Sequence, residues 1–117
     1  MVKVTYCRKD HCLTINGHAL SGEAGHDLVC AGISTLAYTL ANFVYNSVSF
    51  GSATDHIVRL ENGYAEISCK AKRSFRATIT LGFDNICAGF DILARRYPDN
   101  VKFEEINYTR DRKEKDD

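Results

Sequence analysis

The chain has 117 residues, of which 44% are hydrophobic and 26% are charged. That length suits one domain with a single modest core and argues against a second domain. Fifteen basic residues balance fifteen acidic ones, and a net charge of zero argues against a strong sequence-independent grip on RNA or on an anionic membrane. We therefore expect protein or peptide partners, with no direct binding of nucleic acid or membranes.

Two further features indicate a soluble cytoplasmic protein. No stretch approaches eighteen uninterrupted apolar residues, and residues 1–6 alternate like a strand rather than running apolar like a signal peptide. The cysteines are odd in number and irregularly spaced, which is typical of reduced thiols rather than of a disulfide framework. The five are Cys7, Cys12, Cys30, Cys69 and Cys87.

The N-terminal segment predicts a β-hairpin followed by a loop. Apolar residues alternate over residues 2–6, and a second apolar-rich run covers residues 12–17, which indicates two paired strands. His18 then stands at the end of a strand. The glycine-punctuated segment 19–26 is predicted to be a loop.

A long helix is expected next. From Asp27, apolar residues recur at steps of three and four as far as Val44. This spacing predicts an amphipathic helix of about five turns. Asp27 is the expected N-cap, because its side chain can accept a hydrogen bond from an amide of the first turn. Residues 47–54 are rich in serine and contain Gly51, so a loop is expected there.

A second hairpin follows. A short strand ending near Leu60 leads into Asn62 and Gly63, a pair that favours a type I′ turn with positive φ at both positions. The return strand alternates between apolar and polar residues as far as Cys69, so one of its faces should be buried.

The pattern then predicts a second helix. Apolar residues recur between Ile79 and Leu93, and Ser74 is a plausible cap. Gly82 and Gly89 would weaken the interior of this helix by about 1 kcal/mol each. Close packing against a neighbouring element is the expected reason for both glycines.

The elements together predict an α+β fold. Residues 101–108 form a last strand, and the order is β-β-α-β-β-α-β, so two helices should pack on one mostly antiparallel sheet. The predicted domain covers residues 1–108. Residues 109–117 are charged or polar throughout and are expected to be a disordered tail.

Cys30 is placed where a thiol becomes reactive. With Asp27 as N-cap, Cys30 is the third helical residue, and the unpaired amides and positive dipole end of the first turn stabilise a thiolate. His18 lies twelve residues before Cys30, and the loop between them permits the imidazole to fold back to the thiol. A thiolate beside a group that can protonate a leaving amine is the minimum apparatus for thiol acyl transfer.

Several residues offer competing interpretations. His26, four residues before Cys30, competes with His18 for the role of base on helical geometry. Ser34, one turn after Cys30, either hydrogen-bonds near the thiol or satisfies a backbone carbonyl. Neither Ser21 nor Ser34 lies in a Gly-x-Ser-x-Gly nucleophile elbow.

The other cysteines carry weaker signals. Cys7, His11 and Cys12 could meet at the ends of the first hairpin, but a structural zinc site normally needs four ligands, so no metal site is predicted. Cys69 shares a strand face with Ile67 and is expected to fill the core. Cys87 follows an apolar residue in the second helix and has the same expected role.

The loop and the start of the first helix carry a distinctive set of residues: Gly17-His18-Ala19, then Gly22, Gly25 and Asp27, then Leu28-Val29-Cys30-Ala31 and Ser34. Together they resemble the signature of a known family, the bacterial ribosomal-processing cysteine proteases of the Prp or YsxB-like type. The resemblance extends more weakly over about residues 1–107.

The resemblance implies specific roles. Cys30 matches the nucleophile and His18 the general acid and base, while Asp27 matches an acidic position that either orients His18 or only caps the helix. Ser34 is a supporting candidate near the thiol. The glycines of the loop would let it admit an extended peptide and close over it. These glycines are Gly17, Gly22 and Gly25.

The resemblance also implies a task. Members of the family remove a short N-terminal extension from large-subunit ribosomal protein 27 during ribosome maturation, and they suggest a homodimer and an apolar substrate groove between the first helix and the loop. No cofactor is implied. Two alternatives remain open: a non-catalytic ribosome-associated module that binds a peptide, and a thiol redox sensor in which Cys30 pairs with a resolving cysteine.

Overall fold

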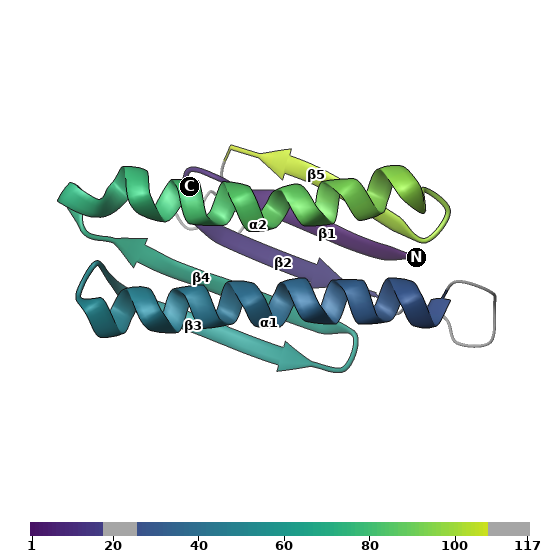
Figure 1. The fold of residues 1–117 in the computed structure, drawn as a ribbon, viewed down its shortest axis with the longest axis horizontal. Coiled ribbons are helices and arrows are strands. Elements are labelled where there is room, and N and C mark those ends of the chain that lie inside the picture. The colour runs from purple at the N-terminus through teal and green to yellow at the C-terminus, as the bar shows by residue number, and fades with distance from the viewer. Residues whose placement is uncertain (18–25, 108–117) are drawn as a thin grey trace, which may run out of the picture.

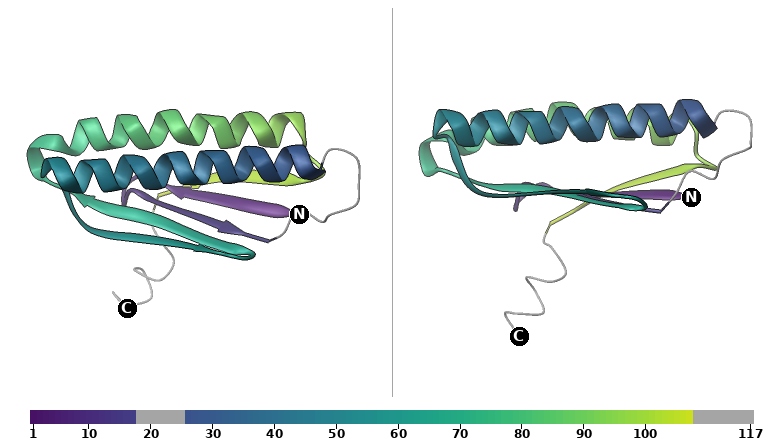
Figure 2. Two further views of the ribbon diagram at one scale, coloured as in Figure 1. Left: turned by 60° about the horizontal axis from the view of Figure 1, so that its bottom comes forward. Right: turned by 90° about the horizontal axis from the view of Figure 1, so that it is seen from below.

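The computed structural model describes residues 1–17 and 26–107, which form two layers. Two long helices lie side by side on one face of a five-stranded sheet (Figures 1 and 2). This arrangement confirms the predicted α+β class and the predicted element order. The elements are β1 (Val2–Cys7), β2 (Cys12–Asn16), α1 (His26–Phe50), β3 (Ala53–Glu61), β4 (Tyr64–Ala71), a 3₁₀ turn η1 (Arg73–Phe75), α2 (Arg76–Arg96) and β5 (Val101–Ile106).

The sheet is mixed, with the strand order β3-β4-β2-β1-β5. Three neighbouring pairs are antiparallel, and only β1 and β5 run parallel. The parallel pair arises because α2 returns the chain to the side of β1 before β5 begins, as a crossover between parallel strands requires. The predicted mostly antiparallel sheet is therefore confirmed. The predicted domain end at residue 108 and the tail 109–117 lie outside the described residues.

The core lies between the sheet and the helices. Alternate residues of β1 and β2 point toward the helices and are almost fully buried, as the period of two in each strand predicts. Within residues 1–17 and 26–107, the opposite face of the sheet has no helix over it (Figure 2). The largest fully buried side chains are Tyr6, Phe83, Phe90, Leu13, Leu40, Ile67, Ile79, Val4, Val29, Val44 and Val101, with Cys7 buried apart from them.

The helix α1 is longer than predicted. It continues to Phe50 and has 25 residues, so the loop expected over residues 47–54 is wrong except at its centre. Ser47 is buried in the helix and donates a 2.8 Å hydrogen bond to the Phe43 carbonyl. The hydroxyl is thereby satisfied inside the helix, and burial of this last stretch outweighs the local preference of serine for loops.

The second hairpin uses a different turn from the one predicted. Glu61 and Tyr64 pair directly, so two residues make the turn. Among the residues described, Gly63 has φ of +83° but Asn62 is absent from those with positive φ. A type I′ turn is therefore wrong, because it needs positive φ at both central positions, whereas a single positive φ at the second position is typical of type II.

The start of α2 also differs from the prediction. Ser74 lies within η1, and the N-cap of α2 is Phe75, without a side-chain capping bond. The chain enters α2 through a 3₁₀ turn closed by a 2.9 Å bond from the Phe75 amide to the Lys72 carbonyl. That backbone bond makes a serine cap unnecessary.

The two glycines of α2 confirm the prediction of close packing. A Cβ at Gly82 would collide with the Phe43 ring of α1, and one at Gly89 would lie 2.6 Å from a methyl carbon of Leu36. The helices can approach each other this closely only because both positions lack a side chain.

Both helices are long and apolar enough to cross a membrane on length and composition alone, over Leu28–Phe50 and Arg73–Arg96. In this fold, each helix instead packs one face against the sheet, where Val29, Val44 and Phe83 are fully buried. Amphipathic packing of this kind accounts for their apolar character.

Candidate functional site

Cys30 lies in the second turn of α1 rather than the first. The helix begins at His26, so Asp27 is its second residue and Cys30 its fifth. The prediction of Asp27 as N-cap is therefore wrong, because the helix begins two residues earlier than that prediction implies, a difference that is common at helix ends. By α-helical geometry the Cys30 amide is directed to the His26 carbonyl, and the unpaired amides precede it, at residues 26–29.

The Cys30 side chain is exposed and borders a cavity of about 470 Å³. The cavity lies between α1, the ends of β1 and β2, and the turn of the β3–β4 hairpin. Its lining combines apolar side chains with the polar residues Ser34, Glu61 and Asn62. It is formed by Val2, Ile15, Gly17, Cys30, Ile33, Ser34, Ala37, Tyr38, Leu60, Glu61, Asn62, Gly63, Tyr64 and Ala65.

One face of α1 forms a wall of this cavity. Cys30, Ser34 and Tyr38 are spaced four residues apart, so they lie one above another on the helix surface. Ser34 is exposed, and the Tyr38 side chain is 64% exposed. The Cys30 thiol therefore lies at one end of this row of three side chains, and the Tyr38 ring lies at the other end.

The facing wall comes from the β3–β4 hairpin. Leu60, Asn62 and Gly63 line it, and Leu60 is 39% exposed. The cavity is therefore bounded by two elements that are far from each other in sequence but packed on the same sheet. We call this cavity the Cys30 groove.

Gly17 closes the base of the Cys30 groove. Its φ is +106°, and a Cβ there would collide with the Met1 carbonyl oxygen. Its amide donates a 3.0 Å hydrogen bond to the Gly63 carbonyl. Only glycine tolerates both the left-handed backbone and this close approach, so the chain leaves β2 at Gly17, beside the hairpin turn and one residue before His18.

The remaining predicted site residues are only partly placed by the structure. His18, Gly22 and Gly25 lie outside the described residues. Asp27 and His26 belong to the first turn of α1. The structure therefore brings Cys30, Ser34 and Gly17 together around one cavity.

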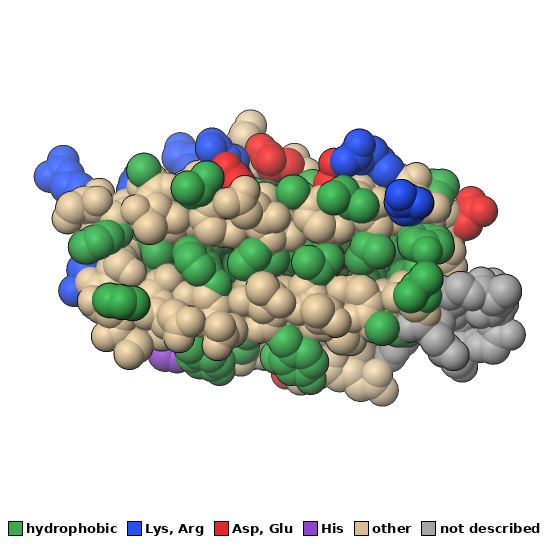
Figure 3. Space-filling view, viewed as in Figure 1, with side chains coloured by type: hydrophobic (Ala, Val, Ile, Leu, Met, Phe, Trp, Pro, Cys, Tyr) green, Lys and Arg blue, Asp and Glu red, His purple; other side chains and the backbone are tan. Residues whose placement is uncertain are grey.

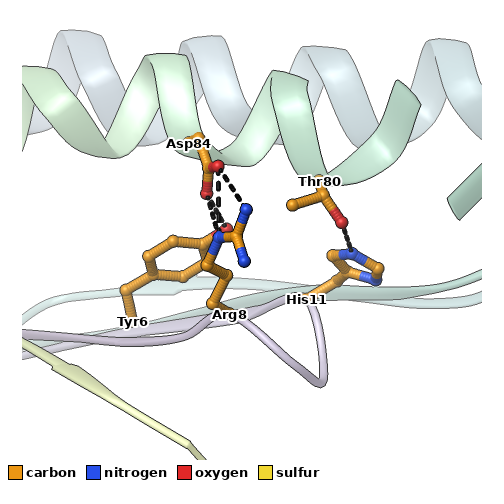
Figure 4. Close-up of polar contacts among 5 residues, drawn as sticks. All are labelled: Tyr6, Arg8, His11, Thr80 and Asp84. Carbon is orange, nitrogen blue, oxygen red and sulfur yellow. Dashed lines mark hydrogen bonds and ion pairs between the residues drawn. The ribbon is translucent and has the colours of Figure 1, made fainter. Parts of the chain in front are cut away.

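A second cluster of polar groups joins the first hairpin to α2 (Figure 4). The Tyr6 hydroxyl and the Arg8 guanidinium donate to the Asp84 carboxylate, and His11 is hydrogen-bonded to the Thr80 hydroxyl at 2.7 Å. The turn that carries Arg8 and His11 lies at the opposite end of the molecule from the start of α1 (Figure 1). This cluster therefore holds the fold together rather than serving the Cys30 groove.

Burial, hydrogen bonds and neighbouring charges shift the pKa values of the titratable groups in this cluster. Partial burial opposes ionisation of Asp84, but hydrogen bonds from Arg8 and Tyr6 outweigh it and hold the pKa of the carboxyl below its ordinary value. Burial, reinforced by the bond to Asp84, raises the pKa of Tyr6. Burial and the nearby Arg76 charge lower the pKa of His11, so its imidazole stays neutral near pH 7.

His11 and the two core cysteines have structural surroundings. The His11 imidazole contacts Thr80 and the Phe83 ring of α2, so it lies on the side of the sheet that carries the helices. Cys69 and Cys87 are buried in the core as predicted. Burial raises the pKa of the Cys69 thiol to about 11 and that of Cys87 further, so both are poor nucleophiles.

Sequence reasoning missed the walls of the groove. Tyr38 lies two turns after Cys30 on the same helix face, a signal that was available in the spacing. Leu60 and Asn62 could not be found in this way, because only the packing of the hairpin against α1 brings them opposite the thiol.

Thiol-dependent enzymes are the class to compare, because an exposed thiol lies near the start of a long helix and beside a groove with an apolar wall. The sequence profile of the family described as cysteine protease Prp matches residues 1–102. The chain therefore belongs to the Prp family and is a cysteine protease. No curated protein sequence shows significant similarity to it.

Solved structures share the fold. SMU.848 from Streptococcus mutans is 26% identical, with a TM-score of 0.68 over 91% of this chain and 94% of that one. The ribosomal processing protease Prp from S. aureus, in complex with a substrate peptide, is 20% identical, with a TM-score of 0.69 over 91% and 100%. The same protease with a covalently linked product peptide is 21% identical, with a TM-score of 0.65 over 90% and 97%.

Proposed function

We propose that this protease removes the N-terminal extension of large-subunit ribosomal protein 27 during ribosome maturation. The observation that carries the proposal is the exposed Cys30 thiol at the Cys30 groove, in a chain of the Prp family. The S. aureus relative is described as an essential ribosomal processing protease, with both a substrate peptide and a covalently linked product peptide. A thiol enzyme that forms a covalent intermediate is consistent with that description.

In the proposed mechanism, the Cys30 thiolate attacks the scissile carbonyl carbon and the bond to the amine nitrogen breaks. His18 gives its proton to the leaving amine. Water, deprotonated by His18, then attacks the thioester carbon, the bond to sulfur breaks and the thiolate is restored. Asp27, about one turn before Cys30 in α1, and Ser34, one turn after it, are proposed supporting residues.

In this mechanism, the start of α1 stabilises negative charge on the thiolate and on the oxyanion. The positive end of the helix dipole and the first-turn amides at residues 26–29, which have no acceptor within the described helix, lie directly before Cys30. Such amides are the expected donors to the developing oxyanion. Because Cys30 lies in the second turn, its own amide is not expected to be one of them.

The shape of the Cys30 groove favours an extended peptide. Ile33, Tyr38 and Leu60 give it apolar side walls, which suit apolar side chains of a leader segment. The segment that follows Gly17, with Gly22 and Gly25, is proposed to close over the bound peptide.

Cleavage of the natural substrate is the direct test. The purified protease is mixed with ribosomal protein 27 carrying its leader, and the products are followed by mass spectrometry. Cys30→Ala and His18→Ala should each abolish or strongly reduce cleavage, whereas His56→Gln, on the exposed surface of β3, should cleave at the normal rate.

His26→Ala separates the two candidate bases. Normal cleavage by this variant together with loss in His18→Ala supports the proposed pair, while the reverse result would assign the base to His26. If the parent protein bound the leader without cutting it, the peptide-binding module would be the better account and the protease assignment would be withdrawn for this substrate.

We further propose that the enzyme is a cytoplasmic homodimer. Hydrophobic side chains gather in a row between the two helices on their outer face, while acidic and basic side chains lie along the edge of α2 (Figure 3). The stretch Leu28–Phe50 contains no charged residue, and its last residue, Phe50, is 90% exposed. Light scattering at micromolar concentration tests this, and a monomer mass would contradict it.

A further inference from the structure

The cysteines at the end of the first hairpin form a pair that the protease chemistry does not use. Cys7 is the last residue of β1 and Cys12 the first of β2, and the two are direct partners in the antiparallel register. Directly opposite residues in an antiparallel pair project their side chains to the same face, with Cα atoms about 4.5 to 5.5 Å apart. Both distances fall within the range that disulfides span.

The surroundings of the two cysteines agree with this geometry. Both line the same hollow, of about 1040 Å³, on the face of the sheet that no helix covers. Cys7 is 1% exposed and is not part of the main core, whereas Cys12 is half-buried. Cys69 also borders this hollow, but the register partner of Cys12 is Ser68 and Cys69 belongs to the core. Strand alternation therefore directs the Cys69 side chain to the helix side of the sheet, away from Cys12.

We propose that Cys7 and Cys12 form an oxidisable dithiol, closed by peroxide into a cross-strand disulfide. The more accessible Cys12 sulfur takes an oxygen atom from hydrogen peroxide: the O–O bond breaks, an S–O bond forms and one water leaves. The Cys7 sulfur then attacks the Cys12 sulfenic acid, the S–O bond breaks, the S–S bond forms and a second water leaves.

A carboxylate is already placed to take up the proton that this step releases. The Cys7 thiol donates a hydrogen bond to Asp10 Oδ2 at 3.3 Å, so the proton can pass to Asp10 as Cys7 attacks and then to the departing hydroxide, which leaves as water. Asp10 lies in the turn between the two cysteines and lines the same hollow. The two thiols thereby have distinct roles, with Cys12 as the attacked sulfur and Cys7 as the resolving one.

The disulfide would tie the two ends of the turn over residues 8–11. That turn carries Arg8 and His11, which contact Asp84 and Thr80 of α2. Oxidation should therefore raise the melting temperature, because the cross-link restricts the unfolded chain and fixes the turn that holds α2. The site lies at the opposite end of the molecule from the start of α1 (Figure 1), so it is independent of the proposed proteolytic function.

Peptide mapping provides the test. The full chain with Cys30→Ala, which removes the exposed thiol of the groove, is treated with hydrogen peroxide, alkylated and digested with trypsin. Arg8 and Lys9 lie between the two cysteines, so an internal disulfide appears as peptide 4–8 joined to peptide 10–59, separable by dithiothreitol. The intact protein should lose about 2 Da and two alkylatable thiols.

Matched variants assign the roles of the sulfurs. In Cys7→Ser, also with Cys30→Ala, the joined peptides should disappear and a sulfenic acid at Cys12 should become trappable by dimedone. In Cys69→Ala the joined peptides should form as in the parent. Absence of the joined pair in the parent, or a link from Cys12 to Cys69 or between two chains, would overturn the proposal. These outcomes are read by mass and do not depend on cleavage of any substrate.

Discussion

The Tyr6 hydroxyl donates a 2.8 Å hydrogen bond to Asp84 Oδ1, and so joins the first strand to the second helix across 78 positions of sequence. Arg8 donates to both oxygens of the same carboxylate, at 3.1 and 3.2 Å. Tyr6 also stacks on Phe83, with ring centroids 6.0 Å apart. One side chain thus contributes an aromatic contact to the core and a polar contact at its border.

Removing this hydrogen bond should weaken the fold in a graded way. Tyr6→Phe should lower the free energy of unfolding by about 1 kcal/mol, because one hydrogen bond is lost while the ring remains. Asp84→Ala should cost about 2 to 3 kcal/mol, since it leaves the buried hydroxyl without its acceptor. Urea unfolding measures both. Arg8→Ala is the control and should cost less than Asp84→Ala, because Arg8 is exposed and its ion pair is screened by solvent; a larger cost for Arg8 than for Asp84 would contradict this account.

His11 should make stability depend on pH. Burial and Arg76 lower its pKa in the folded state, against smaller opposing effects of Asp10 and Asp84. The unfolded chain therefore takes up a proton more readily than the folded one, so stability is fully present above about pH 6.5 and is lost as the pH falls toward the folded pKa. In His11→Gln, the fall in melting temperature between pH 7.5 and pH 5 should be smaller than in the parent. Equal slopes in the two proteins would rule out His11 as the cause.

The contact between Gly82 and Phe43 should show coupling between the helices. Gly82→Ala places a Cβ against the Phe43 ring and should lower stability by about 1 to 3 kcal/mol through overpacking. In a Phe43→Ala background the same change should cost at least about 0.5 kcal/mol less. Gly32→Ala is the matched control. Its Cβ would lie 3.2 Å from a Leu93 methyl carbon, so its helix-propensity gain should offset more of the cost. Strict additivity would argue against a direct clash.

Tyr38 should contribute to substrate binding in the Cys30 groove. Tyr38→Ala removes an apolar wall and should raise the KM for leader cleavage several-fold, with little effect on stability because the side chain is 64% exposed. Tyr45→Ala is the control: it changes a tyrosine two turns further along α1 that contacts His56 and does not line the groove. Steady-state kinetics with the leader peptide distinguish them, and equal KM values would remove Tyr38 from the site.

Local sequence patterns predicted a helix or a strand correctly where a single apolar periodicity ran through the whole segment. The apolar spacing from Val29 to Val44 indicated α1, and strict alternation indicated β1 and β4. The failures occurred at element ends. Ser47 is buried in the helix rather than in a loop, and Asp27 is helical rather than a cap. At an end, a backbone hydrogen bond or a buried methyl group a few residues away outweighs the local propensity of one residue.

By itself, the sequence determined the two helices, the strands, their order and the thiol near the start of α1, because apolar periodicity and turn chemistry are properties of neighbouring residues. The tertiary structure alone decided that Leu60 and Asn62 face Cys30, that Gly82 admits Phe43 and that Asp84 accepts from Tyr6. Each of these contacts joins residues from different elements. Its existence depends on how the helices are placed on the sheet, which no spacing along one segment encodes.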